Sequence, residues 1–127
     1  MRGVTRDDPV KAQACFELFQ RVKAGDEEVA TFDVILHEVL YKLTSRVLYG
    51  LSYQDAAARL RPIVALRGLR LAHRRASLSA LGLFATYTRL DFGDALAVAQ
   101  MAHQGIPEIL SYDGDFDRVP DVRRIEP

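Results

Sequence analysis

Apolar residues recur at helical spacing in five segments of this chain. The first segment follows Asp7 or Asp8 as the N-cap, has Pro9 in its first turn and ends at Gly25. Its apolar positions are Ala12, Cys15, Phe16, Phe19 and Val22. The other helices are predicted over residues 33–49, 52–67, 74–88 and 91–104. The pattern therefore predicts a domain built mainly of helices.

Polar and breaking residues mark the ends of the later helices. Ser52 followed by Asp55 has the spacing of a capping box, and Gly68 is the expected stop of that helix. Pro62 lies inside the same helix and predicts a kink or a break. Gly105 is the expected stop of the last helix.

Short apolar runs between the helices predict strands. They occupy residues 27–32, 69–72, 108–112 and 122–126, and the run "EILSY" at 108–112 is of the buried type. Helices that alternate with short strands are typical of an α/β fold with a parallel sheet. No linker or repeat interrupts the chain, so we predict one domain over residues 1–127.

The second helix, "VILHEVLYKLTSRVLY", is apolar nearly all round, which predicts packing on more than one side. Glu38 shares a face with Val34, Ile35 and Tyr41 and is therefore expected inside the fold. A salt bridge to Lys42, four residues on, is the simpler alternative. His37 points about 100° away from Glu38 and is interpreted as a packed or surface histidine.

The composition of the chain excludes several classes of protein. The chain has 127 residues, 49% of them hydrophobic, which is enough for a single buried core. A lone cysteine, Cys15, excludes an intrachain disulfide and a cysteine-based zinc cluster. The start lacks a signal peptide, and the longest weakly polar stretch, 76–88, is too short to span a bilayer of about 30 Å. We therefore predict a soluble, cytoplasmic protein without a membrane span.

Charge is divided along the chain although the net charge is zero. Residues 51–90 hold seven arginines and a single acid, Asp55, whereas residues 91–127 hold eight acids and three arginines. A basic region beside an acidic one suits a phosphate polyanion held by arginines while carboxylates hold a metal. The alternative is that both regions are solvated faces that pair with each other.

The run "SYDGDFDRVP", residues 111–120, places an aspartate at every second position. It is not an EF-hand loop, because Arg118 stands where a glycine is needed and Arg124 where a bidentate glutamate is needed. Asp113 follows a predicted strand, where ligand sites of α/β sheets lie. Phe116 is expected to anchor the loop, with Asp115 and Asp117 in water; a plain surface turn is the alternative.

A second acidic motif is "LDFGDALAVAQ", residues 90–100. Asp91 and Asp94 lie on one side of the first helical turn, and an N-cap at Asp91 with Asp94 at the third position explains them structurally. Asp94 also shares its face with Ala97, Val98 and Met101 and is carried toward the interior. A buried carboxylate is costly unless it is paired or bound to metal.

Glu38, Asp94 and Asp113 together have the chemistry of a magnesium or manganese site. Hard cations take oxygen ligands, and magnesium keeps several waters, so a few acids aimed at one point suffice. His73 and His103 lack partners at zinc-binding spacing. No nucleophile triad and no phosphate-cradling glycine loop is present in the sequence.

The motifs "VILHEVLYKL", "LDFGDALAVAQ" and "ILSYDGDF" resemble the second, third and fourth acidic motifs of PIN-domain ribonucleases, and most closely those of VapC-type toxins. The resemblance implies a three-layer α/β/α fold with a short parallel sheet. It also implies an endoribonuclease in which Glu38, Asp94 and Asp113 hold Mg²⁺ or Mn²⁺ and an activated water attacks the RNA. A cognate antitoxin that blocks the site, and homodimers, are implied as partners.

The other predicted site residues are assigned around this centre. Ser111 stands where such proteins carry a hydroxyl that hydrogen-bonds in the metal site, and Asp91 and Asp115 are supporting acids. RNA contacts are predicted for Arg70, Arg74 and Arg75 in the arginine-rich region.

The start of the chain departs from the family pattern. PIN domains open with a strand that ends in a first catalytic aspartate, and "MRGVTRDDP" begins where that strand would have finished. We therefore expect an N-terminally truncated PIN-like domain, either because Met1 lies within a longer protein or because the chain is a remnant. In the second case the alternative function is a non-catalytic module that binds antitoxin or RNA without cleavage.

Overall fold

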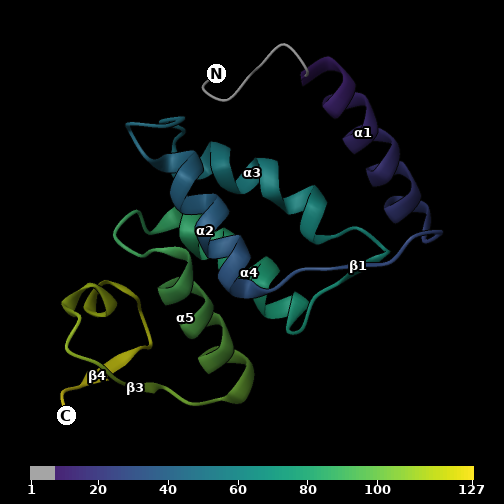
Figure 1. Ribbon diagram of the computed structural model, residues 1–127. Coiled ribbons are helices and arrows are strands. Elements are labelled where there is room, and N and C mark those ends of the chain that lie inside the picture. The colour runs from purple at the N-terminus through teal and green to yellow at the C-terminus, as the bar shows by residue number, and fades with distance from the viewer. Residues whose placement is uncertain (1–7) are drawn as a thin grey trace.

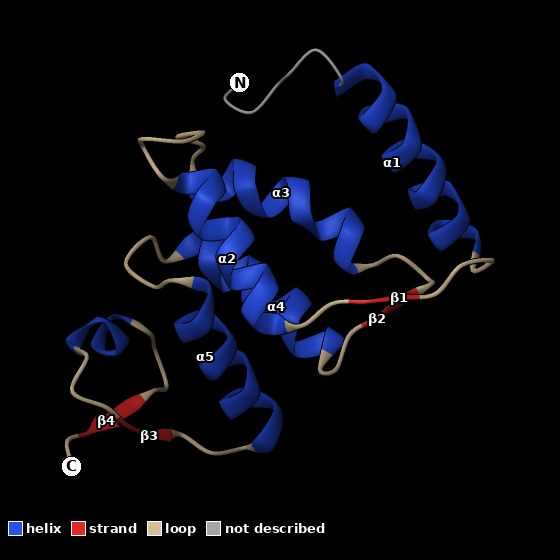
Figure 2. Ribbon diagram, viewed as in Figure 1, coloured by secondary structure: helices blue, strands red, loops and turns tan. Residues whose placement is uncertain are grey.

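The computed structural model describes residues 8–127, which form helices joined by short strands (Figures 1 and 2). The helices are α1 (Asp8–Ala24), α2 (Asp33–Thr44), α3 (Tyr53–Val64), α4 (Arg74–Thr86) and α5 (Phe92–Gln104). The strands are β1 (Val29–Ala30), β2 (Leu69–Arg70), β3 (Glu108–Leu110) and β4 (Arg123–Ile125), and a 3-10 helix, η1, spans Gly114–Arg118. The predicted order of helices and strands is confirmed, and η1 is an addition. The possible cap at Asp7 and the side chain of Cys15 lie outside the description.

Two helices end earlier than predicted. The cap of α3 is confirmed, since the backbone N–H of Asp55 donates to Ser52 Oγ at 3.0 Å. This helix runs through Pro62 without a break but ends at Val64 rather than near residue 67. The prediction that α2 continues to residue 49 is wrong. Ser45 is extended, and a turn closed by the N–H of Gly50 on the carbonyl of Ser45, at 2.8 Å, replaces the last helical turn.

The strands pair in parallel, as predicted, but they do not form one sheet. β1 pairs with β2 in the register Val29↔Leu69, and β3 pairs with β4 in the register Ile109↔Arg124. These are two separate two-stranded sheets (Figure 2). Within residues 8–127 no strand pairs with both β1 and β3, so the expected three-layer arrangement around a single sheet is not formed.

The prediction that residues 108–112 form a buried strand is also wrong. The side chain of Leu110 is 69% exposed, and in β3 only Ile109 is partly buried. Ile109 packs against a small cluster of buried residues, which consists of Leu90, Val98, Phe116 and Val119. The other face of β3 has no covering layer among the residues that the structure describes, so an apolar run ends up exposed.

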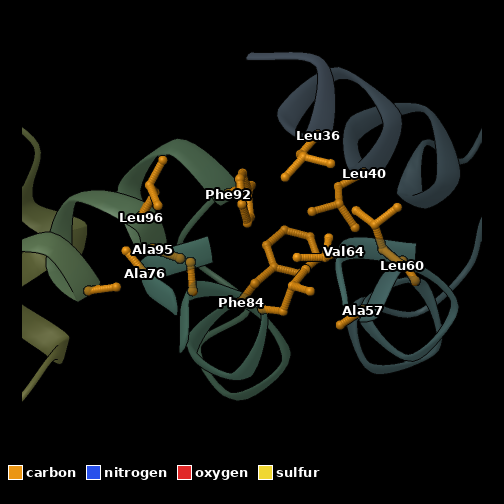
Figure 3. Packing of buried hydrophobic residues seen from close by; sticks show 14 residues of the cluster. Leu36, Leu40, Ala57, Leu60, Val64, Ala76, Phe84, Phe92, Ala95 and Leu96 are labelled. Atoms are coloured by element: carbon orange, nitrogen blue, oxygen red, sulfur yellow. The ribbon is translucent and has the colours of Figure 1, made fainter. Parts of the chain in front are cut away.

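The main core lies between α2, α3, α4 and α5 (Figure 3). Its largest fully buried side chains include Leu40, Leu81 and Phe92. The ring of Phe84 stacks on that of Tyr53 with a centroid distance of 4.2 Å, which joins α4 to α3. This core rests on helix packing rather than on a sheet, and it holds the start of α5 firmly in place.

Packing covers only one side of α2. Leu36 and Leu40 are buried in the main core, whereas Val34, Ile35 and Tyr41 are exposed. The prediction of packing all round is therefore wrong for residues 8–127. The reason is geometric: α3 and α5 contact the Leu36–Leu40 face, and no described element covers the opposite one.

Ser77 is a buried polar residue of α4 whose hydroxyl finds no hydrogen-bond partner among the described residues. We expect Ser77→Ala to raise the free energy of unfolding by about 1 kcal/mol, because the unsatisfied hydroxyl is removed and alanine favours the helix. Thermal unfolding followed by circular dichroism measures this. The reverse change in the same helix, Ala80→Ser, places a hydroxyl at another fully buried position and should lower the melting temperature. A destabilised Ser77→Ala variant would show that its hydroxyl is satisfied in solution.

Membrane insertion was not expected from the sequence. In the part of the chain that the structure covers, no helix has both the length and the hydropathy needed to cross a bilayer.

Candidate acidic site

Two aspartates at the start of α5 have different structural roles. Asp91 is the N-cap, and its Oδ1 accepts a hydrogen bond from the backbone N–H of Asp94 at 2.8 Å. The predicted capping interaction is therefore confirmed. Between them, Phe92 is only 1% exposed and fixes this turn in the main core. The carboxylate of Asp91 is used in capping, which leaves that of Asp94 available for a ligand.

His37 of α2 binds the same turn. The backbone N–H of Gly93 donates to His37 Nδ1 at 3.1 Å, across 56 positions of sequence. This N–H belongs to the first turn of a helix and has no intrahelical acceptor. The interpretation of His37 as an ordinary packed or surface residue missed this role, because no local spacing in the sequence relates the two residues.

We expect His37→Ala to free the amide of Gly93. The loss of one hydrogen bond corresponds to about 1 kcal/mol, or roughly fivefold faster local opening. Hydrogen exchange of the Gly93 amide by NMR measures it, and His103→Ala, an exposed histidine in the last turn of the same helix, is the matched control. Unchanged exchange in His37→Ala would show that the contact is not maintained in solution.

The segment after β3 is organised by short hydrogen bonds around Asp113. The hydroxyl of Ser111 accepts from the N–H of Asp113 at 3.0 Å, and Asp113 Oδ1 accepts from the N–H of Asp115 at 2.9 Å. Phe116 is 4% exposed, so the predicted anchor is confirmed. These contacts fix the backbone on both sides of Asp113, and among the described residues no protein donor binds its second carboxylate oxygen.

Of the two aspartates predicted in water, Asp117 is exposed as predicted, whereas Asp115 is partly buried. Both carboxylate oxygens of Asp117 also accept hydrogen bonds from Arg124 at 3.1 Å. These hydrogen bonds lower the pKa of Asp117 from its ordinary value. Arg124 thereby ties η1 to β4 and keeps Asp117 out of the candidate site.

The pKa of Asp94 depends on acids of both acidic motifs. The pKa of Asp94 is raised to about 6, first by burial and then by the negative charges of Asp91 and Asp113. The effect of Asp113 indicates that the carboxylates at the start of α5 and after β3 lie in the same region of the fold. The predicted interior position of Asp94 agrees with its partial burial.

Glu38 is not brought to this pair. Its side chain is exposed, because α2 packs through Leu36 and Leu40, so the expected interior position is wrong. No ion pair joins it to Lys42 in the described residues, and its charge is not among the causes of the raised pKa of Asp94. In residues 8–127 no three His, Cys, Asp or Glu side chains lie close enough together to hold a metal.

The donor chemistry of Asp94 and Asp113 nevertheless fits a hard cation. Magnesium is often held by one or two carboxylates and completes its shell with waters and substrate phosphates. A cation between the two groups would also relieve the repulsion that raises the pKa of Asp94. Asp94 and Asp113 are therefore candidate ligands, with the exposed Glu38 as a third.

The predicted RNA-binding arginines lie at a distance from these acids. Arg70 forms an ion pair with Glu28, and Arg74 donates to the carbonyl of Leu69. Arg74 and Arg75 line a cavity of about 350 Å³ at the start of α4 and the end of α5. Since Asp94 lies in the first turn of α5, this cavity and the acids are separated by most of a helix about 20 Å long.

The ion pairs do not join the basic region to the acidic one. Among the described residues, Arg123 pairs with Glu108, and Arg124 pairs with Asp117 and Glu126. The acids of residues 91–127 are thus partly neutralised by arginines of the same region. Mutual pairing of the two regions, the alternative drawn from the sequence, is not found in the described residues.

The fold is a helical α/β domain, and its candidate site has one aspartate in the first turn of a helix and another after a strand. The chain matches the PIN domain family over residues 4–122, nearly its full length, and it belongs to that family. PIN domains are generally nucleases and typically use divalent metal ions. Comparisons with curated proteins and with solved structures returned no match.

Proposed function

We propose that this protein is a metal-dependent endoribonuclease of the VapC type, which hydrolyses phosphodiesters in RNA and is neutralised by a cognate antitoxin. The observation that carries the nuclease part is the raised pKa of Asp94, to which burial and the charges of Asp91 and Asp113 contribute, with Asp113 coming from the other acidic motif. Family membership supports the same reaction class. The toxin role rests on the resemblance of the acidic motifs.

In this proposal Asp94, Asp113 and Glu38 hold Mg²⁺ or Mn²⁺. The metal supplies an activated water and neutralises charge on the phosphoryl oxygens. Asp91 orients Asp94 through the cap at the start of α5, and Ser111 and Asp115 orient Asp113 through its backbone and carboxylate. The exposed side chain of Glu38 has to turn toward α5 to join them.

RNA is proposed to contact Arg70, Arg74 and Arg75 outside the cleavage site. Support comes from the cavity at the start of α4, which Arg74 and Arg75 line together with His73 and His103. In the described residues neither Arg74 nor Arg75 forms an ion pair with a carboxylate. Arg74 also donates to the carbonyl of Leu69, so the exposed Arg75 has more donors left for phosphates.

Protein partners are proposed on the exposed face of α2. Val34, Ile35 and Tyr41 form an apolar surface there, and Val47 follows in the next turn with 85% exposure. Such surfaces mark sites of protein interaction. The proposed occupants are the antitoxin and, in a homodimer, a second copy of the chain.

The test is cleavage of single-stranded RNA by the purified protein in MgCl₂ and in EDTA. We expect products only with metal and none from the Asp94→Asn variant, since the pair of carboxylates is then broken. RNA binding without cleavage under either condition would favour the non-catalytic binding module instead. Absence of both binding and cleavage would reject both functions.

A further inference from the structure

A second cavity is lined by residues that neighbour the acidic motifs in the sequence. It has a volume of about 310 Å³ and lies between the α4–α5 connection and η1. Two cationic side chains line it, Arg89 from the connection and Arg118 from η1, together with Thr88 and Asp115. We call it the Arg89–Arg118 pocket.

The walls of this pocket are fixed to each other. Leu90 follows Arg89 in the sequence and is 1% exposed, and Phe116 lies two residues before Arg118. Both side chains belong to the same small buried cluster. Because buried neighbours hold the backbone on each side, the two arginines are presented from a rigid frame rather than from free loops.

The segments that carry the arginines also carry the acids. Arg89 precedes Asp91 and Asp94 on the segment that enters α5, and Asp113 begins the turn that leads to Arg118. The charge of Asp113 is one cause of the raised pKa of Asp94. The pocket is therefore lined by the same two segments that carry the acids, unlike the cavity of Arg74 and Arg75 at the far end of α5.

The charge of the pocket suits an anion. Arg89 and Arg118 are exposed, and neither forms an ion pair with any carboxylate of residues 8–127. Asp115 is the acid that lines the pocket, and its backbone N–H is directed to Asp113. A guanidinium presents a planar fork of donors that matches phosphate oxygens, and a metal held by carboxylates alone leaves the neighbouring phosphates of a polyanion without counter-charge.

We propose that the Arg89–Arg118 pocket binds a backbone phosphate of the RNA next to the phosphodiester cleaved at Asp94 and Asp113. This inference rests on the proposed function and names the residues that position its substrate. The contact is to the phosphodiester, so it is independent of base sequence. It sets the register of the strand over the two carboxylates.

The experiment measures binding of a fluorescent single-stranded RNA in EDTA, so that metal-dependent cleavage does not interfere. We expect Arg89→Ala and Arg118→Ala each to weaken binding about tenfold, and to reduce the slope of log K against log salt by about 0.7, the value for one lost phosphate contact on a single strand. Arg118→Lys keeps the charge but loses the fork, so its affinity should fall between those of wild type and Arg118→Ala.

Arg59→Ala is the matched control, since it removes one exposed arginine from α3 and should leave the salt slope unchanged. An equal loss in Arg59→Ala would overturn the pocket in favour of a general effect of net charge. Cleavage that requires Asp94 but unchanged RNA affinity in both pocket variants would overturn the pocket and leave the proposed function intact. If wild type binds no RNA, both fail. Inorganic phosphate at equal ionic strength should compete only weakly; full competition would assign the pocket to free phosphate instead.

Discussion

Asp94→Asn is expected to abolish magnesium-dependent RNA cleavage, by more than about 100-fold, and at the same time to stabilise the metal-free protein at neutral pH. Both effects have one cause. Asp94 is partly buried beside Asp91 and Asp113, which raises its pKa to about 6. The ionised carboxylate of Asp94 can hold a cation, but without a cation it lowers the stability of the folded protein.

The pH dependence of this stability follows from the direction of the shift. The folded protein holds the proton of Asp94 more tightly than the unfolded chain, in which the pKa is 3.8. Stability therefore falls as the pH rises from about 4 to about 6 and is constant above that range. Allowing for partial exposure, we expect Asp94→Asn to be more stable than wild type by about 1 kcal/mol at pH 7.5, and equal to it near pH 4.

Thermal unfolding in EDTA at both pH values measures the difference, and MgCl₂ should raise the melting temperature of wild type but not of Asp94→Asn. Asp26→Asn removes a charge from an exposed turn and should change neither cleavage nor the pH dependence. Cleavage by Asp94→Asn at the wild-type rate would remove Asp94 from the site. If Asp94→Asn were less stable than wild type at pH 7.5, ionised Asp94 would not destabilise the metal-free protein, which contradicts this prediction.

Phe92→Ala is expected to cost about 3–5 kcal/mol of unfolding free energy, because it leaves a cavity in the main core. A domain of this size has only about 5–15 kcal/mol in total, so the variant should be partly unfolded at room temperature. The ring of Phe92 lies among core residues of α2 and α4 (Figure 3). Since it sits between Asp91 and Gly93, its loss also releases the turn that presents Asp94.

Urea unfolding measures this cost. Phe92→Leu keeps an apolar side chain and should lose about 1–2 kcal/mol. Phe32→Ala is the matched control, because Phe32 is 61% exposed and its truncation should change stability by less than about 0.5 kcal/mol. Equal losses in Phe92→Ala and Phe32→Ala would mean that the main core is packed differently.

Local patterns in the sequence predicted most helices and caps. Ser52 and Asp91 cap α3 and α5 as their spacing indicated, and Phe116 anchors its loop. The two caps depend on residues three positions apart, which the sequence displays directly. The same is true of Asp94, whose partial burial followed from the helical face it shares with apolar neighbours.

Features that depend on distant contacts were not predictable in this way. The periodicity of α2 does not state how many of its faces find a partner, so Glu38 was expected inside and is exposed. The hydrogen bond from Gly93 to His37 joins two helices with no common motif. Likewise, the strand patterns predicted parallel strands but not their division into two sheets. Which distant strands pair with each other cannot be deduced from local sequence patterns.

The candidate site lies between two parts of the fold that have separate buried clusters of different size. Asp94 is carried by α5, which belongs to the main core, whereas Asp113 belongs to a C-terminal segment held by a cluster of four buried residues that includes Phe116. Segments with few buried contacts open locally at lower free energy than the whole domain. We therefore expect the C-terminal segment to open at a lower free energy than the helical core, and such an opening would separate Asp113 from Asp94. A cation held by both carboxylates would stabilise the closed position of this segment. Metal binding and closure of the segment would then be coupled, and both would be needed for cleavage.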